Sequence, residues 1–355
     1  MSSLNFYHDE PLFGLDIGHS NLKVMQLQTE PGKKPRVLGY GAGGYPAESM
    51  ANGVIVDYKA ISHALYKIFT EGITGNISAK RVACTIPTSR TFSRPMRLPL
   101  MDDDQLKEAV RLEAEQYIPL HPDNLYIDYE ITHQDSEGVD VLMMAAPRNI
   151  VDSYMRLLEA IGLEPVALEP TMNATSRLFG LADPSHGAPT LLMDFGSLSV
   201  DMAAIDKTMF VNSTIAGGSD DIDNLISKGL KVSKQEAYDL KNKYGISTSK
   251  YQDAITESVR PLLENLIREC KKTVRYYNER AAANRKIVQI IIIGGGANMP
   301  GLSQYLSREL DMPARMLDPW RQLDFGELRP PSEVERSMYV TVAGEAILQP
   351  EVIFA

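Results

Sequence analysis

Two stretches of the chain share an aspartate and a glycine that are separated by one apolar residue and followed by small polar residues. Asp16 and Gly18 define the first stretch, and Asp194 and Gly196 define the second, 178 residues later. Apolar residues alternate on both sides, which predicts a β-hairpin whose turn presents backbone N–H groups to an anion. Glycine lets the main chain approach a phosphate closely. Each aspartate is a candidate ligand, directly or through water, for a Mg²⁺ ion.

A single copy of this pattern would also fit a surface hairpin without function, and the repeat favours the phosphate site. The candidate phosphate ligands are the turn glycines, the small polar residues and one lysine: Gly18, Ser20, Asn21, Lys23, Gly196, Ser197 and Ser199. Alternation lets Lys23 point either toward the anion or toward solvent. Gly217 and Gly218 precede a predicted helix, and the N–H groups at a helix N-terminus attract anions.

A third glycine-rich segment follows an apolar strand predicted at 287–293. Gly294, Gly295 and Gly296 form its turn, and Met299 follows shortly after. The strand is apolar throughout, as a central parallel strand covered on both faces should be. The segment lies late in the second half of the chain, where such a turn suits packing against the base and ribose of a nucleotide.

The order of the three segments resembles that of the actin-like ATPase superfamily, in which two phosphate motifs precede an adenosine motif. The resemblance implies an α/β, actin-like (ribonuclease H-like) two-lobed ATPase fold that binds ATP or ADP with Mg²⁺ between its lobes. Residues 88–165 add a strand–helix–strand–strand–helix unit, in which Asp102 and Gln105 cap the first helix. This insertion resembles the α+β subdomain of SHS2 type in FtsA-like proteins.

These elements divide the chain into five predicted segments. They are the start of the first lobe at 1–87, the inserted subdomain at 88–165, the return to the first lobe at 166–188, the second lobe at 189–335, and an interdomain connecting helix with a tail at 336–355. Within them we expect a long core helix over about 252–283 and a helix that is capped by Ser332 with Glu335 and runs to Ala346.

The amino-acid sequence of the inserted unit resembles that of the PilM family of cytoplasmic type IV pilus assembly proteins. The matching runs are 111–120, Asp128-Tyr129, 145–148 and 162–165, and the likeness extends from Phe13 to about Leu348. The resemblance implies a scaffold of the inner-membrane assembly platform. It also implies a partner, the cytoplasmic N-terminal tail of the bitopic pilus protein PilN, in a groove lined by parts of 81–98 and 139–147. The protein would then be cytoplasmic, and peripheral at the inner membrane through partners.

Two further resemblances concern the nucleotide. Bacterial actins hold the ribose with the glutamate of an Ala-Glu-x-x-Lys segment, and Tyr238 stands at that position here. Ribose contact would therefore pass to Glu236, Asp239 or Lys241, or be weaker. The segment Leu168-Glu169-Pro170-Thr171 resembles a motif of sugar kinases and Hsp70, which makes Glu169 a candidate catalytic residue that orients water. The alternative is an acid that complements a helix dipole.

Composition limits the other functions. The chain has 355 residues, a net charge of −10 and a pI of about 5.2, so a nucleic-acid partner is not expected. We expect no signal peptide, no transmembrane helix and no direct membrane insertion. Cys84 and Cys270 lie in apolar patterns and are expected in the core, as in a reducing cytosol. We read His19 and His186 as loop residues, because neither has a second ligand at metal-binding spacing.

Several alternatives stay open at this point. A sugar kinase would need a base for the substrate hydroxyl, and a chaperone would need a further substrate-binding domain. A cell-division FtsA-like protein would end in a basic amphipathic helix, whereas 348–355 carries no positive charge. Two hypotheses remain: a GspL-like secretion protein, and a slow ATPase that self-associates into filaments. We expect at most slow ATP hydrolysis.

Overall fold

The fold is described from a computed structural model over residues 11–183, 187–281 and 285–348. His186 and the tail beyond Leu348 lie outside the described residues. The chain divides into two compact units. Unit 1 combines Met1–Arg177, Leu323–Arg329 and Thr341–Ala355, and unit 2 combines Leu178–Gln322 and Pro330–Val340. The segment boundaries predicted from the sequence remain a prediction.

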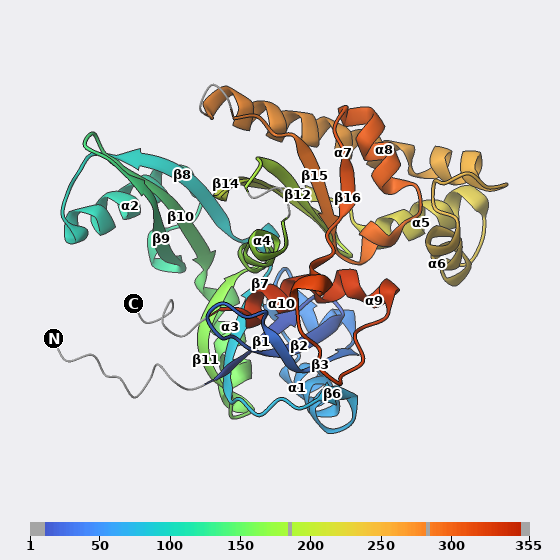
Figure 1. The fold of residues 1–355 in the computed structure, drawn as a ribbon, viewed down its shortest axis with the longest axis horizontal. Coiled ribbons are helices and arrows are strands. Elements are labelled where there is room, and N and C mark those ends of the chain that lie inside the picture. Colours follow the sequence, from blue (N-terminus) through green and yellow to red (C-terminus); the bar gives the residue numbers. More distant parts are fainter. Residues whose placement is uncertain (1–10, 184–186, 282–284, 349–355) are drawn as a thin grey trace. The chain divides into compact units, whose positions relative to one another are not determined.

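Unit 1 is built on a six-stranded sheet with the strand order β11-β7-β1-β2-β3-β6 (Figure 1). Its strands are β1 (Leu12–Ile17), β2 (Asn21–Gln28), β3 (Arg36–Gly44), β6 (Ile73–Gly75), β7 (Arg81–Ile86) and β11 (Glu164–Pro170). The predicted first hairpin is confirmed, because β1 and β2 pair antiparallel. β7 pairs parallel to β1 on its other side. β1 and β7 are buried along their whole length, which explains their nearly continuous apolar sequence.

Helices α1 (Tyr58–Lys67) and α3 (Arg148–Ala160) contribute buried residues to the same core as β1, β2 and β7. The predicted cap of α1 is confirmed: the Asp57 side chain accepts a hydrogen bond from the Ala60 N–H at 3.0 Å. A single π-helical turn, Ile68–Gly72, extends α1. Cys84 lies in this core, as predicted. The short strands β4 (Met50–Ala51) and β5 (Val54–Ile55) pair with each other.

The inserted subdomain has the predicted order of elements. Strands β8 (Phe92–Leu98), β9 (Leu125–Gln134) and β10 (Val139–Pro147) form a sheet in the order β8-β10-β9, and α2 (Asp103–Tyr117) packs against it (Figure 1). Asp102 and Gln105 form the predicted capping box. Leu106, Val110 and Ala114 of α2 are buried against the sheet, so the period of this helix decides which of its faces is covered.

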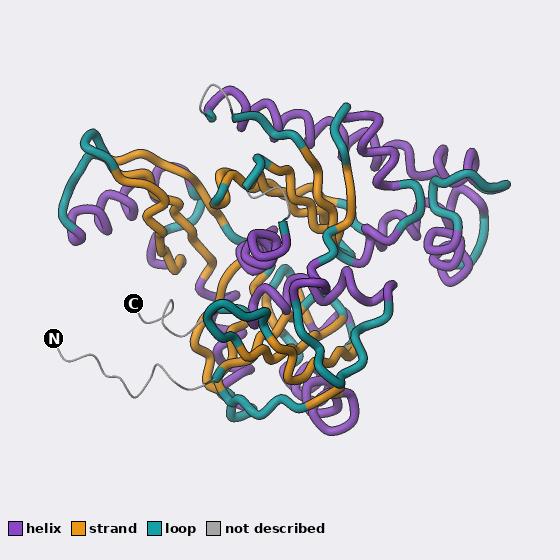
Figure 2. The backbone as a smooth tube through the Cα atoms, in the orientation of Figure 1, coloured by secondary structure: helices purple, strands orange, loops and turns teal. Residues whose placement is uncertain are grey.

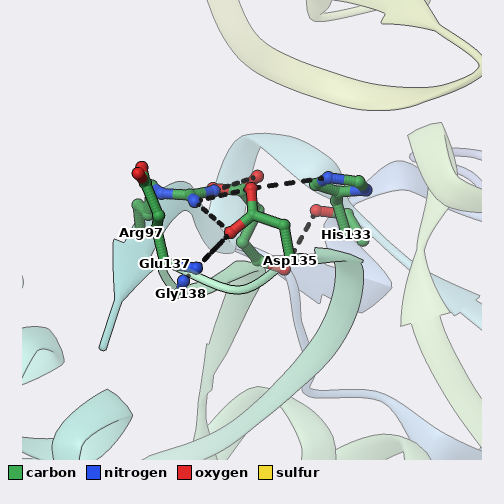
Figure 3. A network of polar contacts seen from close by, with 7 residues as sticks. Arg97, His133, Asp135, Glu137 and Gly138 are labelled. Carbon is green, nitrogen blue, oxygen red and sulfur yellow. Dashed lines mark hydrogen bonds and ion pairs between the residues drawn. The ribbon is translucent and has the colours of Figure 1, made fainter. Parts of the chain in front are cut away.

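One polar network fixes the β9–β10 turn to the edge strand β8 (Figure 3). Nη2 of Arg97 lies 2.7 and 2.8 Å from the two carboxylate oxygens of Asp135, and Nη1 donates to Asp140 at 3.0 Å. Asp135 also accepts hydrogen bonds from the N–H groups of Glu137 and Gly138, at 2.8 and 3.0 Å. The hydrogen bonds from Arg97 and from these backbone groups lower the pKa of Asp135 to about 2.

Unit 2 contains a five-stranded sheet with the order β14-β13-β12-β15-β16. Figure 2 shows the strands in orange and the helices in purple. The strands are β12 (Thr190–Phe195), β13 (Ser199–Asp206), β14 (Thr208–Ala216), β15 (Gln289–Ile293) and β16 (Ala314–Met316). The predicted second hairpin is confirmed by antiparallel pairing of β12 with β13, and β15 runs parallel to β12. Hairpin, returning third strand and parallel neighbour therefore repeat the arrangement β7-β1-β2-β3 of unit 1.

The helices of unit 2 are α5 (Ser219–Leu230), α6 (Lys234–Lys243), α7 (Gln252–Arg280) and α8 (Leu302–Leu310). The predicted apolar stripe of α7 packs into the core, with Cys270 in it, and α7 stays helical through Pro261. The expected single helix from Ser332 is wrong. It is divided into α9 (Glu333–Arg336), a 3₁₀ turn at Ser337–Tyr339 and α10 (Val340–Ala346). Helix α4 (Thr171–Ala182) follows β11.

Candidate functional site

The first candidate turn connects β1 to β2. The Gly18 N–H donates to the Asn21 carbonyl at 2.9 Å, and the Ser20 carbonyl accepts from the Tyr45 N–H at 3.0 Å. The Tyr45 hydroxyl also donates to the Gly18 carbonyl. These bonds set the shape of the turn and leave the N–H groups of His19 and Ser20 without a hydrogen bond in the described chain. Both residues are partly exposed, so their N–H groups are available to an anion.

The second candidate turn, between β12 and β13, repeats this geometry. The Gly196 N–H donates to the Ser199 carbonyl at 3.0 Å, and the Leu198 carbonyl accepts from the Gly217 N–H at 3.1 Å. Among the described residues, the N–H groups of Ser197 and Leu198 have no acceptor. Two turns 178 residues apart thus present the same pair of backbone donors.

A row of side chains crosses the sheet of unit 1 next to the first turn. Glu169, Thr85, Asp16 and Lys23 occupy directly paired positions on four neighbouring strands, so their side chains share one face. Asp16 is buried, and it accepts from Lys23 Nζ at 2.7 Å and from the Thr85 hydroxyl at 2.8 Å. The structure therefore directs Lys23 to Asp16 and away from solvent. Thr85 was not predicted as a site residue from the sequence. Its hydroxyl group in an otherwise apolar strand is the only feature that could have indicated it.

The equivalent row of unit 2 carries a different set of charges. Asp194 is paired with Ile293 on one side and with Asp201 on the other, and Asp201 is paired with Thr214. The Thr214 hydroxyl donates to Asp201. Burial raises the pKa of Asp201 to about 6, and the bond from Thr214 opposes that rise. Asp201 was also missed, although it follows Asp194 at the spacing at which Lys23 follows Asp16.

The triple-glycine turn packs against the Asp194 strand. Gly294 has a φ of 83°, and a Cβ there would lie 2.3 Å from Oδ1 of Asp194. A Cβ on Gly296 would lie 3.0 Å from Cβ of Phe195, whereas Gly295 has more room. Met299 is buried in the hydrophobic core of unit 2. The glycines thus allow close approach, and Met299 supports the turn from inside.

The start of α5 holds the second turn in place. The N–H groups of Ser219 and Asp220 donate to the carbonyls of Gly196 and Ser197, at 2.9 and 3.0 Å. A Cβ on Gly218 would lie 2.4 Å from the Ser197 carbonyl oxygen. Gly217 has a φ of 103°. Because the first donors of the helix bind the turn, the glycine pair positions Ser197 for an anion.

The predicted ribose contacts already have partners within unit 2. Lys241 is almost fully buried and donates to Asp223 at 2.8 Å and to the Ser219 hydroxyl at 2.6 Å. Glu236 accepts from Ser233 in the capping box of α6, and Asp239 accepts from Gln235. Tyr238 is half exposed, with its ring centroid 5.1 Å from Lys241 Nζ.

The candidate catalytic residue Glu169 lies at the end of β11. Nη2 of Arg177 lies 2.7 Å from each of its two oxygens and donates to Oε2. Thr85 separates it from Asp16 in the row across the sheet. The structure thus brings together Glu169 and Asp16, which are far apart in the sequence. The side chain is partly buried, and its Oε1 accepts no hydrogen bond within the described residues.

None of the helices in residues 11–183, 187–281 and 285–348 is long and apolar enough to cross a membrane. The same residues contain no group of three or more His, Cys, Asp or Glu side chains placed to hold a metal ion.

Comparison with solved structures shows the fold. A structure titled as the PilM-PilN type IV pilus biogenesis complex is 22% identical, covers 95% of this chain and 98% of that chain, and has a TM-score of 0.82. The ethanolamine utilization protein EutJ from Carboxydothermus hydrogenoformans is 15% identical over 97% and 93% of the two chains, with a TM-score of 0.56. MreB5 of Spiroplasma citri bound to AMPPNP is 14% identical over 97% of each chain, with a TM-score of 0.54.

These likenesses confirm the predicted actin-like α/β fold. The family follows from the sequence itself. A family model described as type IV pilus assembly protein PilM matches residues 14–348, nearly the whole chain. The chain therefore belongs to the PilM family of type IV pilus assembly proteins.

Proposed function

We propose that the protein is a nucleotide-binding scaffold of the type IV pilus assembly platform, and that its two hairpin turns bind the phosphates of ATP or ADP with Mg²⁺. The observation that carries this proposal is the repeated turn. In each copy the glycine N–H closes the turn onto a carbonyl three residues later, and the two intervening N–H groups stay available. Among the structures with the same fold, one is of a protein bound to AMPPNP.

The two aspartates differ in how they suit a metal ion. Both oxygens of Asp16 already accept hydrogen bonds, so Asp16 suits contact through a metal-bound water. Asp194 and Asp201 supply the carboxylate oxygens that Mg²⁺ prefers. When bound, the ion would offset the negative charge of the phosphates. Lys23 adds a positive charge beside the first turn, within reach of a phosphate that displaces it from Asp16.

Hydrolysis on this site is at most slow. Glu169 is the group on the Asp16 face that is suited to orient water, and its bond to Arg177 holds the carboxylate in place. A scaffold needs the nucleotide as a structural ligand and does not need turnover. Robust turnover by the isolated protein that is unchanged in Glu169→Ala would contradict this part of the proposal.

Calorimetry tests the nucleotide site. Wild-type protein should bind ATP in the presence of Mg²⁺ and bind it much more weakly with a chelator. Asp16→Ala and Asp194→Ala should each remove the metal-dependent part. Asp135→Ala is the matched control, because it removes an exposed carboxylate of the inserted subdomain. Wild-type affinity in both site variants would refute the assignment.

The proposed partner is the cytoplasmic N-terminal tail of a PilN-type bitopic protein, which would keep the scaffold peripheral at the inner face of the inner membrane. Family membership and the fold shared with a PilM-PilN complex support this partner. We place the tail along parts of 81–98 and 139–147, where its apolar side chains would dock and where the edge strand β8 could accept its backbone.

Titration of a labelled synthetic tail tests this docking site. Ordering the tail opposes binding, so we expect roughly micromolar affinity, about −8 kcal/mol. Ala146→Arg, in β10, should weaken binding at least tenfold. Leu112→Arg, on the exposed side of α2, is the control and should leave it unchanged. Equal binding by both variants would place the tail elsewhere, and filaments formed with ATP by a protein that binds no tail would favour self-association.

A further inference from the structure

Glu345 is a fully buried carboxyl group of unit 1. It belongs to α10, which presses on β1 at Gly14. A Cβ on Gly14 would lie 2.7 Å from the backbone of both Val342 and Ala346, and 3.1 Å from Cβ of Glu345. Gly14 precedes Asp16 by two residues and shares its face of the sheet. Glu345 is therefore buried over the same face that carries the row of Glu169, Thr85, Asp16 and Lys23.

Four ionisable groups interact electrostatically with Glu345. They are Glu169 of β11, Arg177 of α4, Asp16 of β1 and, from the opposite face of the sheet, the Cys84 thiol of β7. The Glu169 carboxyl lies within hydrogen-bonding reach of the Glu345 carboxyl. Arg177 donates to Glu169 and, through Nη1, to the Gly344 carbonyl at 2.8 Å. Within the described chain, no N–H or O–H group donates to either oxygen of Glu345 or to Oε1 of Glu169.

The carboxyl groups on this face outnumber the cations. Lys23 balances Asp16, and Arg177 balances Glu169. Glu345 is a third carboxyl with no cation of its own. A buried ionised carboxylate without a partner is strongly unfavourable, and protonation removes that cost. Burial, and then the Glu169 charge, raise the pKa of Glu345 well above its usual range, and Arg177 opposes the rise.

We propose that Glu345 is a neutral carboxylic acid at neutral pH, and that its O–H donates to the Glu169 carboxylate and positions it. A single proton then links one of the two unpaired oxygens of Glu345 to the unpaired Oε1 of Glu169. Glu169 receives two donors, Arg177 on one side and Glu345 on the other, which fixes its orientation. Glu345 is thus a positioning residue for Glu169. The consequence for water orientation rests on the proposed function, whereas the shared proton does not.

Infrared spectroscopy of the protein without nucleotide tests the proton directly. At pH 7 the wild type should show the carbonyl band of a buried protonated carboxylic acid. Glu345→Gln should lose this band, because the amide keeps the shape and a donor but has no acid. Glu164→Gln is the control. Glu164 lies on β11, the strand that carries Glu169, but it is exposed and pairs with Arg81, so the band should remain in this variant. A wild-type spectrum without the band, or a band that persists in Glu345→Gln, would overturn the proposal.

The pH dependence of stability gives a second readout. A carboxyl whose pKa is raised in the folded state holds its proton more tightly there, so stability falls as pH rises from about 4.5 toward the folded pKa. Relative to Glu345→Gln, the folding equilibrium constant of the wild type should fall by up to tenfold for each pH unit in that range. A difference between the two proteins that is independent of pH from 5 to 9 would contradict a neutral Glu345.

The positioning role has its own comparison. Glu345→Leu removes the donor, and Glu345→Gln keeps it. If wild-type protein turns over ATP slowly, turnover should fall in the leucine variant and return in the glutamine variant. Equal turnover in both would refute positioning while leaving the infrared result intact. Absence of nucleotide binding in the wild type would count against the proposed function, and the shared proton would still be tested by the spectrum.

Discussion

The hairpins of the two units share a backbone and differ at one decisive position. Both close with the same hydrogen bond, receive a third strand in the same way and present two backbone donors. Opposite the aspartate, however, the first hairpin has Lys23 and the second has Asp201. The first is therefore balanced in charge, and the second concentrates negative charge. A repeated scaffold can thus keep its geometry while its two copies take different electrostatic roles.

The difference has physical consequences for each unit. In unit 1 the ion pair is buried, so its members stabilise the fold only together, and loss of one leaves an uncompensated charge. In unit 2 two aspartates occupy paired positions on neighbouring strands, and burial disfavours the ionised form of Asp201. We infer a division of labour in which the second hairpin contributes more to metal binding and the first contributes the positive charge.

Breaking the ion pair of unit 1 should have the largest effect. Lys23→Met leaves Asp16 buried without its cation, and we expect a loss of about 3–5 kcal/mol in the free energy of unfolding. Chemical denaturation measures this loss. The double variant Asp16→Asn, Lys23→Met removes both charges and should recover most of the stability without recovering nucleotide binding. A double variant as unstable as the single one would show that packing, and not the charge pair, determines the effect.

In unit 2, removing one of the two paired aspartate carboxylates should have a smaller effect. This effect should be on nucleotide binding. Asp201→Asn should lower the affinity for Mg²⁺–ATP about tenfold, or about 1.4 kcal/mol, because the metal loses a negatively charged neighbour. Affinity for ATP without metal should rise, since the phosphates meet less repulsion. Calorimetry with Mg²⁺ and with a chelator separates the two changes. A fall of equal size in both conditions would indicate a general disturbance of the turn.

An exposed ion pair sharpens the contrast with the buried one. Arg97 binds Asp135 with good bidentate geometry, yet both groups are exposed and screened by solvent. The pKa of Asp135 is lowered to about 2, so the contribution of the pair is present above about pH 4 and is lost as pH falls toward 2.

In Arg97→Ala the pKa of Asp135 should rise toward its ordinary value of 3.8 without reaching it, because the backbone donors of Glu137 and Gly138 remain. Global stability at pH 7 should hardly change. An NMR titration of the carboxyl and a denaturation curve check the two statements. A loss of stability comparable to that of Lys23→Met would show that burial does not separate the two pairs.

Local patterns predicted much of the fold. Both hairpins, the capped helices α1 and α2 and the apolar stripe of α7 follow from alternation, capping residues and helical period. The C-terminal helix was misjudged because its apolar spacing is continuous, whereas the backbone changes to a 3₁₀ turn at Ser337. Periodicity alone does not reveal such a break.

The parts of the site that the sequence did not predict depend on strand pairing. Thr85 and Asp201 matter because the strand register pairs them with Asp16 and Asp194. The residues next to Thr85 and Asp201 in the sequence do not reveal this register. Glu345 and Glu169 are 176 residues apart and meet only because α10 packs over β1 and α4. The resemblance to known families identified the turns and Glu169 as site residues. Their partners became visible only in the tertiary packing.

The most direct test of the account is to observe the four turn amides during nucleotide binding. In an amide NMR titration with ATP and Mg²⁺, the N–H signals of His19, Ser20, Ser197 and Leu198 should all shift along one saturable curve. Amides of the inserted subdomain, such as Glu137 and Gly138, should stay in place. If nucleotide binds while the signals of either turn remain unmoved, that turn does not hold a phosphate and the central claim is wrong.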